Sequence, residues 1–303
     1  MTKRSLTLIA TLGALIQLAA FATAQADTLG RIRETGKLRL GHRSDARPFS
    51  YEDESGHAAG YSIALCKEIA DAVKAELGLA QLAVEDVKVE AGDRFDEVES
   101  GSVDLLCGAA TDTLERRKKV AFSLPIFPSG IGALLRVDAP PRVRAALEGR
   151  EPPYRPRWRA SLAEALEKRV LTAQAGTTAA DWLAKRRGEL EVNAEIVNVS
   201  SYAEGVQRVL VRTSDAMFGD RAILLDAAAR SPSASDLVVL DREYTYEPIA
   251  LVGARGDSDF LLLVDRTLSR LYRSGKIVEI YTRFFGKPDE STQAFFRFSA
   301  RPE

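Results

Sequence analysis

The chain has 303 residues, with 42 Lys and Arg against 43 Asp and Glu, so its formal net charge is −1 at pH 7. A chain of this length can form one large domain or two lobes with substantial cores. Because the charge is nearly balanced, the composition argues against nucleic acid or an anionic membrane surface as the main partner.

The N-terminus has the pattern of a secretory signal peptide over residues 1–26. Lys3 and Arg4 precede the apolar run Leu6–Phe21, and the small residues in Ala24–Ala26 offer a cleavage site. A retained N-terminal anchor is the alternative. No later apolar run approaches the roughly 20 residues needed to span a bilayer. We therefore expect a soluble, exported protein.

Helices and strands are expected to alternate in the first half of the chain. Ser62 is a good N-cap for an amphipathic helix that has Ile63, Cys66 and Ile69 on one face. Alternation of this kind is typical of a mostly parallel, wound α/β sheet. The other expected elements are a helix at Leu29–Thr35, a strand at Lys37–Gly41, a strand at Val84–Val89, a helix at Arg94–Ser100 and a strand at Val103–Leu106.

The stretch Val103–Ser123 combines features that suit carboxylate binding. Its strand runs into small and hydroxyl residues that end at Thr111, and Asp112 and Glu115 have the spacing of a capping box for a following helical turn. Arg116 lies in that first turn. Backbone N–H groups, a hydroxyl and a guanidinium at the carboxyl end of a strand can together hold a carboxylate. An ordinary strand–turn–helix with a solvated Arg116 is the alternative.

A second α/β unit is expected after a Pro- and Arg-rich insertion at about 138–160. We interpret this insertion as an exposed loop rather than a specific anion site. The expected elements are a helix with a capping box at Ser161 and Glu164, a strand at Val170–Ala173, a turn at Gly176–Thr178 before a helix from Ala179, strands at Ile196–Val199, Ala216–Phe218 and Leu237–Leu240, a return segment at Ile249–Val252, and two amphipathic C-terminal helices.

The chain is expected to cross between the two units near 131–137 and again near 244–252. Two such crossings predict two lobes with a cleft between them. Ligands of wound α/β sheets bind at the carboxyl ends of the strands, which would lie at this interface.

Residues for catalysis or metal binding are sparse. The sequence has no nucleophile elbow and no phosphate-binding Gly loop, and the spacing of His42 and His57 does not favour a metal site. We therefore predict no metal and no cofactor. Cys66 and Cys107 are the two cysteines, and in an oxidising compartment they can form one disulfide. Two buried free thiols are the alternative.

Five segments in register resemble the periplasmic glutamate/aspartate-binding proteins of ABC-type importers, within the family 3 extracellular solute-binding proteins. They are GHRSDARPFSY (Gly41–Tyr51), GYS (Gly60–Ser62), CGAATDTLERRKKVAFS (Cys107–Ser123), AGTT (Ala175–Thr178) and AMFGDRAILL (Ala216–Leu225). The resemblance implies a type II periplasmic-binding-protein fold with lobes at 27–133 plus 250–303 and at 134–249. It also implies a periplasmic location, an amino-acid ligand captured by hinge closure, and a membrane permease as partner. We expect a monomer.

The resemblance also implies the roles of single residues. Arg116 would pair with the ligand α-carboxylate, helped by Thr111 and one of two threonines in AGTT, and Asp220 would accept the α-ammonium. Arg43 and Arg94 would hold the side-chain carboxylate. These arginines against Asp220 give a site charge near +2, which favours an acidic ligand. The implied ligand-binding residues are Arg43, Arg94, Thr111, Arg116, Thr177, Thr178, Tyr202 and Asp220.

Three positions depart from the family pattern. Ala91 and Ala109 replace hydroxyl residues and Tyr202 replaces a histidine, which leaves open aspartate, glutamate, a related dicarboxylate or an amide such as glutamine. Phe49 and Tyr51 lie either in the pocket wall or in the core. A periplasmic dehydratase on the same fold and a sensor for another polar amino acid are the alternative functions.

Overall fold

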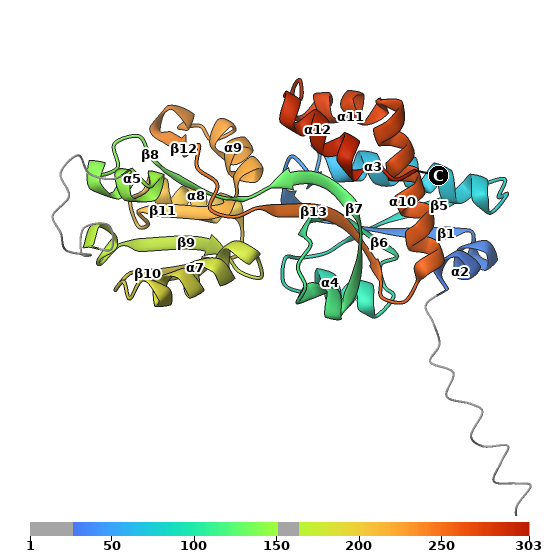
Figure 1. Cartoon of the computed structure of the whole chain (residues 1–303). Coiled ribbons are helices and arrows are strands. Elements are labelled where there is room, and N and C mark those ends of the chain that lie inside the picture. Colours follow the sequence, from blue (N-terminus) through green and yellow to red (C-terminus); the bar gives the residue numbers. More distant parts are fainter. Residues whose placement is uncertain (1–26, 151–163, 303) are drawn as a thin grey trace, which may run out of the picture.

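The computed structural model describes residues 27–150 and 164–302. The predicted signal peptide, the end of the insertion and the capping residue Ser161 lie outside these ranges. The start of the insertion is not the expected exposed loop: it forms the helix α5 (Pro141–Glu148), which buries Val143 and Leu147. Figure 1 shows two lobes joined by extended segments. Within the described ranges, no helix has the length and apolar character needed to cross a membrane.

The first lobe is built on a five-stranded sheet in the order β5-β1-β6-β13-β7. β1 pairs in parallel with β5 and β6, whereas β13 is antiparallel to both β6 and β7. The sheet is therefore mixed, and only its first three strands agree with the expected parallel arrangement. The strands are β1 (Lys37–His42), β5 (Ala83–Lys88), β6 (Leu105–Thr111), β7 (Val120–Ser129) and β13 (Glu247–Ala254).

Helices cover both faces of this sheet because its strands bury side chains on both sides. Along β6, Leu105 and Cys107 pack into one core, and Leu106 and Ala110 pack into another on the opposite face. The helices α3, α10 and α12 contact the sheet on the first face, while α4 lies on the second. The helices of this lobe are α2 (Thr28–Thr35), α3 (Tyr61–Glu76), α4 (Arg94–Glu99), α10 (Ser258–Ser274), α11 (Lys276–Phe285) and α12 (Glu290–Ser299).

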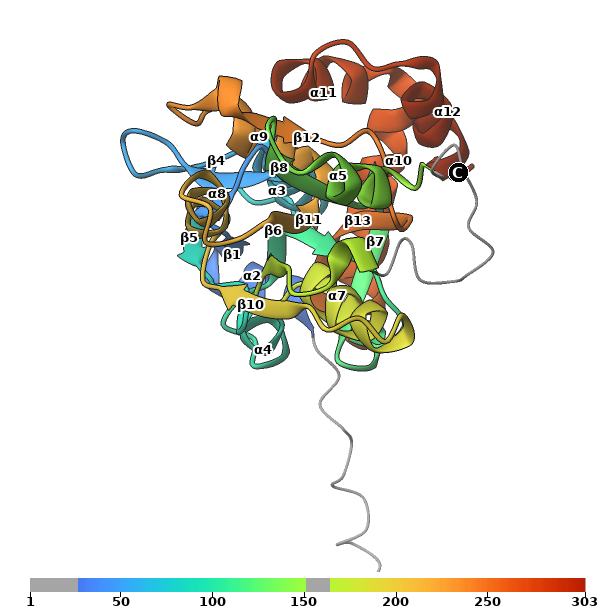
Figure 2. The same cartoon turned by 90° about the vertical axis from the view of Figure 1, so that its left-hand side faces the viewer.

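The second lobe repeats this plan with a sheet in the order β10-β9-β11-β8-β12. Helices α5 and α7 lie on one face of this sheet and α8 and α9 on the other (Figure 2). Ala133 and Phe218 point into the core on the first face, and Leu134 and Met217 into the core on the second. β10, β9 and β11 are parallel, and β8 and β12 are antiparallel. The elements are β8 (Ile131–Arg136), α5 (Pro141–Glu148), β9 (Val170–Gln174), α7 (Thr178–Glu189), β10 (Glu195–Val199), α8 (Tyr202–Leu210), β11 (Ala216–Asp220), α9 (Arg221–Ala229) and β12 (Leu237–Val239).

The chain passes between the two sheets at Gly130 and returns between β12 and β13. β8 belongs to the second sheet from Ile131 onward, since Ile131 pairs with Asp220. The outgoing and returning segments lie against each other: a Cβ on Gly130 would lie 2.2 Å from the carbonyl oxygen of Thr245. Glycine is therefore required where the two connections meet.

Two of the expected helix starts are wrong. The N-cap of α3 is Gly60, and the Ser62 hydroxyl instead donates to the Gly108 carbonyl oxygen at 2.9 Å.

The second wrong helix start is the one expected after β6. The strand β6 continues to Thr111 because the Asp112 amide donates to the carbonyl oxygen of Pro248 in β13, at 2.9 Å. The turn after it is a short 3-10 helix from Arg116 to Lys118 rather than a capped α-helix.

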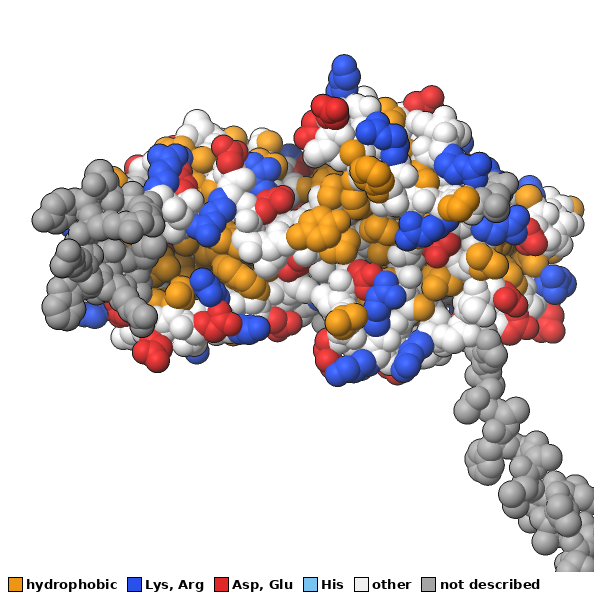
Figure 3. Space-filling model, viewed as in Figure 1, with side chains coloured by type: hydrophobic (Ala, Val, Ile, Leu, Met, Phe, Trp, Pro, Cys, Tyr) orange, Lys and Arg blue, Asp and Glu red, His pale blue; other side chains and the backbone are white. Residues whose placement is uncertain are grey.

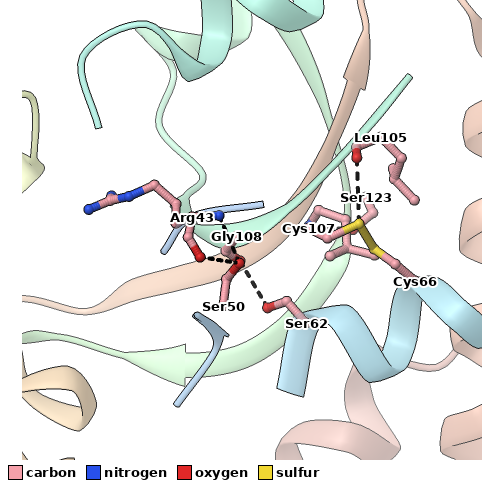
Figure 4. Close-up of a disulfide and its surroundings, with 9 residues drawn as sticks. Arg43, Ser50, Ser62, Cys66, Leu105, Cys107, Gly108 and Ser123 are labelled. Atoms are coloured by element: carbon pink, nitrogen blue, oxygen red, sulfur yellow. Dashed lines mark hydrogen bonds between the residues drawn. A yellow bond between two sulfur atoms is a disulfide. The ribbon is translucent and has the colours of Figure 1, made fainter. Parts of the chain in front are cut away.

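The predicted disulfide is confirmed. Cys66 of α3 is bonded to Cys107 of β6, with 6.2 Å between their Cα atoms. Figure 4 shows the bond between the helix and the sheet that it covers, with the Ser62–Gly108 hydrogen bond close by. The bridge therefore fixes α3 to the strand that leads to Thr111.

Removal of the disulfide should lower stability. The bond joins residues 41 positions apart, and the loop-closure entropy of such a bridge corresponds to about 4 kcal/mol in the unfolding free energy. We expect the double variant Cys66→Ala/Cys107→Ala to unfold at lower urea concentration than the native chain. A reducing agent should shift the midpoint of the native chain and leave that of the variant unchanged; an equal shift in both would contradict the prediction.

Candidate functional site

The residues expected to bind a ligand come from both lobes and lie at strand ends and helix starts. In the first lobe they follow β1, begin α4, end β6 and begin the 3-10 turn. In the second lobe they begin α7 and α8 and end β11. These positions face the junction between the lobes, where several of them bond across it. The first-lobe residues are Arg43, Arg94, Thr111 and Arg116, and the second-lobe residues are Thr177, Thr178, Tyr202 and Asp220.

Arg94 is a buried cation with unused hydrogen-bonding capacity. Only 3% of the residue is exposed. Its Nη2 donates to the Gly176 carbonyl oxygen in the other lobe at 3.2 Å, while Nε and Nη1 have no partner among the described residues. Burial, with the nearby charges of Arg116 and Arg43, lowers the pKa of Arg94 to about 9. A carboxylate placed here would satisfy both nitrogens and reverse this effect.

Arg116 lies beside Arg94. Its Nη1 donates to the Thr111 carbonyl oxygen at 2.9 Å, and burial lowers its pKa. The guanidinium carbons of Arg94 and Arg116 lie 4.4 and 5.0 Å from the centroid of the Phe95 ring. No carboxylate of the described residues forms an ion pair with either arginine. Two neighbouring guanidinium groups held in this way have the chemistry to bind an anionic group.

Thr111 and Thr178 meet across the lobes, with 3.5 Å between their hydroxyl oxygens. Both donate to the carboxylate of Glu247 at the start of β13, at 3.2 and 2.5 Å. Sequence reasoning did not identify Glu247, because the return segment has no motif that marks it. The carboxylate becomes part of the site only because β13 passes between the lobes.

The two threonines of the AGTT segment have different roles. Thr177 is the N-cap of α7: its hydroxyl donates to the Gln174 carbonyl oxygen at 2.7 Å and accepts from the Ala180 amide. Its side chain therefore stabilises the helix start. Thr178 is the threonine whose hydroxyl reaches Glu247 and Thr111.

Asp220 ends β11 and caps α9. One carboxylate oxygen accepts from the amides of Ala222 and Ile223, and the other accepts from the Ser129 hydroxyl in the connection to the first lobe. Burial raises the pKa of Asp220 to about 6 despite these hydrogen bonds. The Tyr202 hydroxyl oxygen accepts from the Asp220 amide at 3.3 Å, which places this phenol beside the carboxyl group.

Arg43 already has protein partners. Its Nε donates to Asp45 at 2.8 Å, and its Nη2 donates to Gln174 of the second lobe at 3.1 Å. Sequence reasoning did not identify Asp45 or Gln174, although they lie in or beside the segments Gly41–Tyr51 and Ala175–Thr178. The position of Asp45, two residues after Arg43, was the feature of the sequence that could have indicated this ion pair.

The two lobes touch along this junction. Gly176 has φ +72°, and a Cβ there would lie 2.9 Å from the carbonyl oxygen of Ala91 in the other lobe. The loop of Ala91 thus contacts the AGTT turn through its backbone, whereas Ala109 lies within β6 and packs against the core. On the face drawn in Figure 3, the lobes meet at a waist.

A cavity of about 450 Å³ opens beside the junction. Asp45, Tyr51 and Tyr202 line it together with residues of α9. The guanidinium of Arg47 lies 3.8 Å from the centre of the Tyr51 ring. Phe49 is fully buried and packs on Phe127, so it belongs to the core, while Tyr51 lies in the cavity wall.

The charge of the site differs from the expected value near +2. Asp45 and Glu247 form hydrogen bonds with site residues, so they add two negative charges to that of Asp220. The site thus has three carboxylates and the three guanidinium groups of the predicted arginines. The formal sum is zero, yet the charges are unevenly paired, because Arg94 and Arg116 lack an acid partner in the described part of the chain. Within residues 27–150 and 164–302, no three His, Cys, Asp or Glu side chains gather as a metal site would require.

The fold has two lobes joined by two crossing segments. Both lobes contribute cations, acids and hydroxyls to one junction. This combination defines a hinged ligand-binding protein. The sequence match is more specific. The chain belongs to the bacterial extracellular solute-binding proteins, family 3, whose sequence pattern matches residues 38–287.

Relatives in this family bind amino acids. The L-glutamate/L-aspartate-binding protein of Pseudomonas aeruginosa is 30% identical over 94% of this chain and 88% of that protein. The glutamate/aspartate import solute-binding protein of Escherichia coli is 24% identical over 88% of this chain and 82% of that protein. Among solved structures, an ancestral amino-acid-binding protein, AncCDT-1, described as a precursor of cyclohexadienyl dehydratase, has a TM-score of 0.68 at 26% identity and covers 86% of this chain and all of that chain.

The raised pKa of Asp220 predicts a pH dependence of stability. The folded state holds the Asp220 proton up to about pH 6, whereas the unfolded chain loses it near pH 3.8. Ionisation of Asp220 should therefore lower the stability of the native chain as the pH rises through this window, by about 3 kcal/mol at most. Asp220→Asn keeps a capping side chain and lacks this contribution, so its unfolding free energy in urea should rise relative to that of the native chain between pH 4 and 7. Parallel pH profiles for the two proteins would contradict the prediction.

Proposed function

We propose that this protein captures an acidic amino acid between its lobes and delivers it to the membrane permease of an ABC-type importer. The observation that carries the proposal is Arg94, a buried guanidinium two of whose nitrogens have no hydrogen-bond partner in residues 27–150 and 164–302. A buried cation without an anion is costly, and a carboxylate ligand removes that cost. The glutamate- and aspartate-binding relatives support the same ligand class.

The ligand would be held at three points. Its α-carboxylate would pair with Arg116 and accept from Thr111 and Thr178, and its α-ammonium would donate to Asp220. Its side-chain carboxylate would lie on Arg94. Since these groups come from both lobes, a ligand would stabilise the closed arrangement relative to an open one.

The hinge would lie at the two connections between the sheets. We place one lobe at residues 27–130 plus 247–303 and the other at 131–246, a shift of three residues from the boundaries expected at 133 and 249. The shift rests on β8, which pairs wholly within the second sheet, and on Glu247, which pairs with Ser129 in the first. We further propose cleavage of residues 1–26, a periplasmic location and a monomer.

The competing function is an enzyme on the same fold. Two observations favour it: AncCDT-1 is described as a precursor of a dehydratase, and the pKa of Asp220 near 6 would suit proton transfer. We favour binding without turnover, because the family and the glutamate- and aspartate-binding relatives are solute-binding proteins. Proton NMR of a mixture of protein and ligand would detect any product.

Ligand specificity should be visible in thermal unfolding. Glutamate or aspartate should raise the melting temperature because its side-chain carboxylate would pair with the buried Arg94, whereas leucine has no such group and should raise it less. Calorimetric titration with a panel of amino acids and dicarboxylates would rank the ligands. Equal stabilisation by leucine and glutamate would contradict an acidic ligand.

Removal of the Arg94 charge should separate binding from folding. Arg94→Gln should weaken glutamate binding by about 100-fold or more, since a buried charge-assisted contact is lost. The melting temperature without ligand should not fall, because the variant buries one charge fewer. Arg33→Gln, at an exposed position of α2, is the matched control and should bind as the native chain does. Unchanged glutamate affinity in Arg94→Gln would refute the assigned role.

A further inference from the structure

Arg43 and Arg94 were expected to share one task, and the structure separates them. Both side chains are buried, and both reach the second lobe. Arg94 meets only a backbone carbonyl there, with two of its nitrogens unpartnered in the described part of the chain. Arg43 meets a carboxylate of its own lobe and an amide of the other. The two arginines therefore offer different environments to a ligand.

The partners of Arg43 form a closed set of hydrogen bonds. One oxygen of Asp45 accepts from Arg43 Nε at 2.8 Å and also from Nη2. The other oxygen accepts from Gln174 Nε2 at 2.7 Å, and the Gln174 carbonyl oxygen accepts from Arg43 Nη2 at 3.1 Å. Gln174 Nε2 also donates to the Ser200 carbonyl oxygen at 2.8 Å. Asp45 thus contacts Arg43 in the way that a ligand carboxylate would.

The backbone holds this arrangement in place. The Arg43 amide donates to the Ser50 hydroxyl at 2.9 Å, and Asp45 in β2 (Asp45–Ala46) pairs with Tyr51 in β3 (Ser50–Glu52). Figure 4 shows the Arg43 guanidinium extending away from the disulfide and from Ser50. Gln174 is the last residue of β9 and is 2% exposed. None of the three side chains is a freely moving surface group.

We infer that Asp45 is a specificity-determining residue: it occupies the carboxylate position on Arg43 and leaves Arg94 as the receptor for the ligand side-chain carboxylate. This inference rests on the proposed function. The Asp45 carboxylate repels a second carboxylate near Arg43, so that region favours a neutral polar group of the ligand. The site consequently distinguishes glutamate from glutamine through one arginine rather than two.

The experiment measures the dissociation constants of glutamate and glutamine by calorimetry, and their ratio is the readout. Asp45→Asn keeps the shape of the side chain and removes its charge, which leaves Arg43 available to an anion. We expect it to raise the preference for glutamate over glutamine by about tenfold or more. Asp45→Ser is a second variant of different shape and should act in the same direction. Asp71→Asn, on the exposed side of α3, removes the same charge elsewhere and should leave the ratio unchanged.

A double variant tests whether the effect passes through Arg43. In Asp45→Asn/Arg43→Gln the gain should vanish, because no guanidinium is left to attract the second carboxylate. A preference that persists in the double variant would overturn the inference, as would an unchanged or reduced preference in both Asp45→Asn and Asp45→Ser.

The same titrations distinguish failure of the inference from failure of the proposed function. Glutamate binding by Asp45→Asn but not by the native chain would refute the proposed ligand and support the role of Asp45. Glutamate binding by the native chain with no gain in either Asp45 variant would refute the role of Asp45 alone. Binding of glutamate by none of the proteins would overturn both.

Discussion

The buried guanidinium of Arg94 is the constraint on which the site depends. It begins a short helix in the first lobe, is almost fully covered, and bonds to the backbone of the second lobe at Gly176. Arg116 beside it adds a second positive charge, and both side chains lie near Phe95. Because the buried Arg94 and the partly buried Arg116 are held side by side at the junction, an anion bound there would be stabilised. The other groups of the site are arranged around this requirement.

Three carboxylates have different parts in that arrangement. Asp45 is committed to Arg43, Glu247 accepts from a threonine of each lobe, and Asp220 caps α9. The formal charge is balanced, but the balance is local to Arg43 and leaves the region of Arg94 positive. In the proposed binding mode, a ligand with a second carboxylate would bring an anion to Arg94 and a cation to Asp220, neither of which has an oppositely charged partner among the described residues. Which arginines lack a carboxylate partner is therefore a better guide to the charge of the ligand than the net charge of the site.

The connections between the lobes are also part of the site. Glu247 begins β13 and Ser129 ends β7, and these two residues pair with each other while contacting Thr178 and Asp220 of the second lobe. Opening of the hinge would alter these contacts directly. Under the proposed function, ligand contact and lobe movement would therefore be coupled through the same few residues.

The sequence by itself determined the alternation of helices and strands, the two-unit plan, the disulfide partners and the family, because periodicity, strand-end residues and ordered motifs are local properties of the chain. It did not determine the capping of α3 or the end of β6, since Ser62 bonds to Gly108 and Asp112 bonds to the returning strand β13. Nor could the sequence distinguish the role of Thr177 from that of Thr178, or the role of Arg43 from that of Arg94. Those distinctions depend on which groups meet across the junction, such as Gln174 with Asp45 and Thr111 with Thr178. Only the tertiary structure brings them within hydrogen-bond distance, because they are far apart in sequence and belong to different lobes.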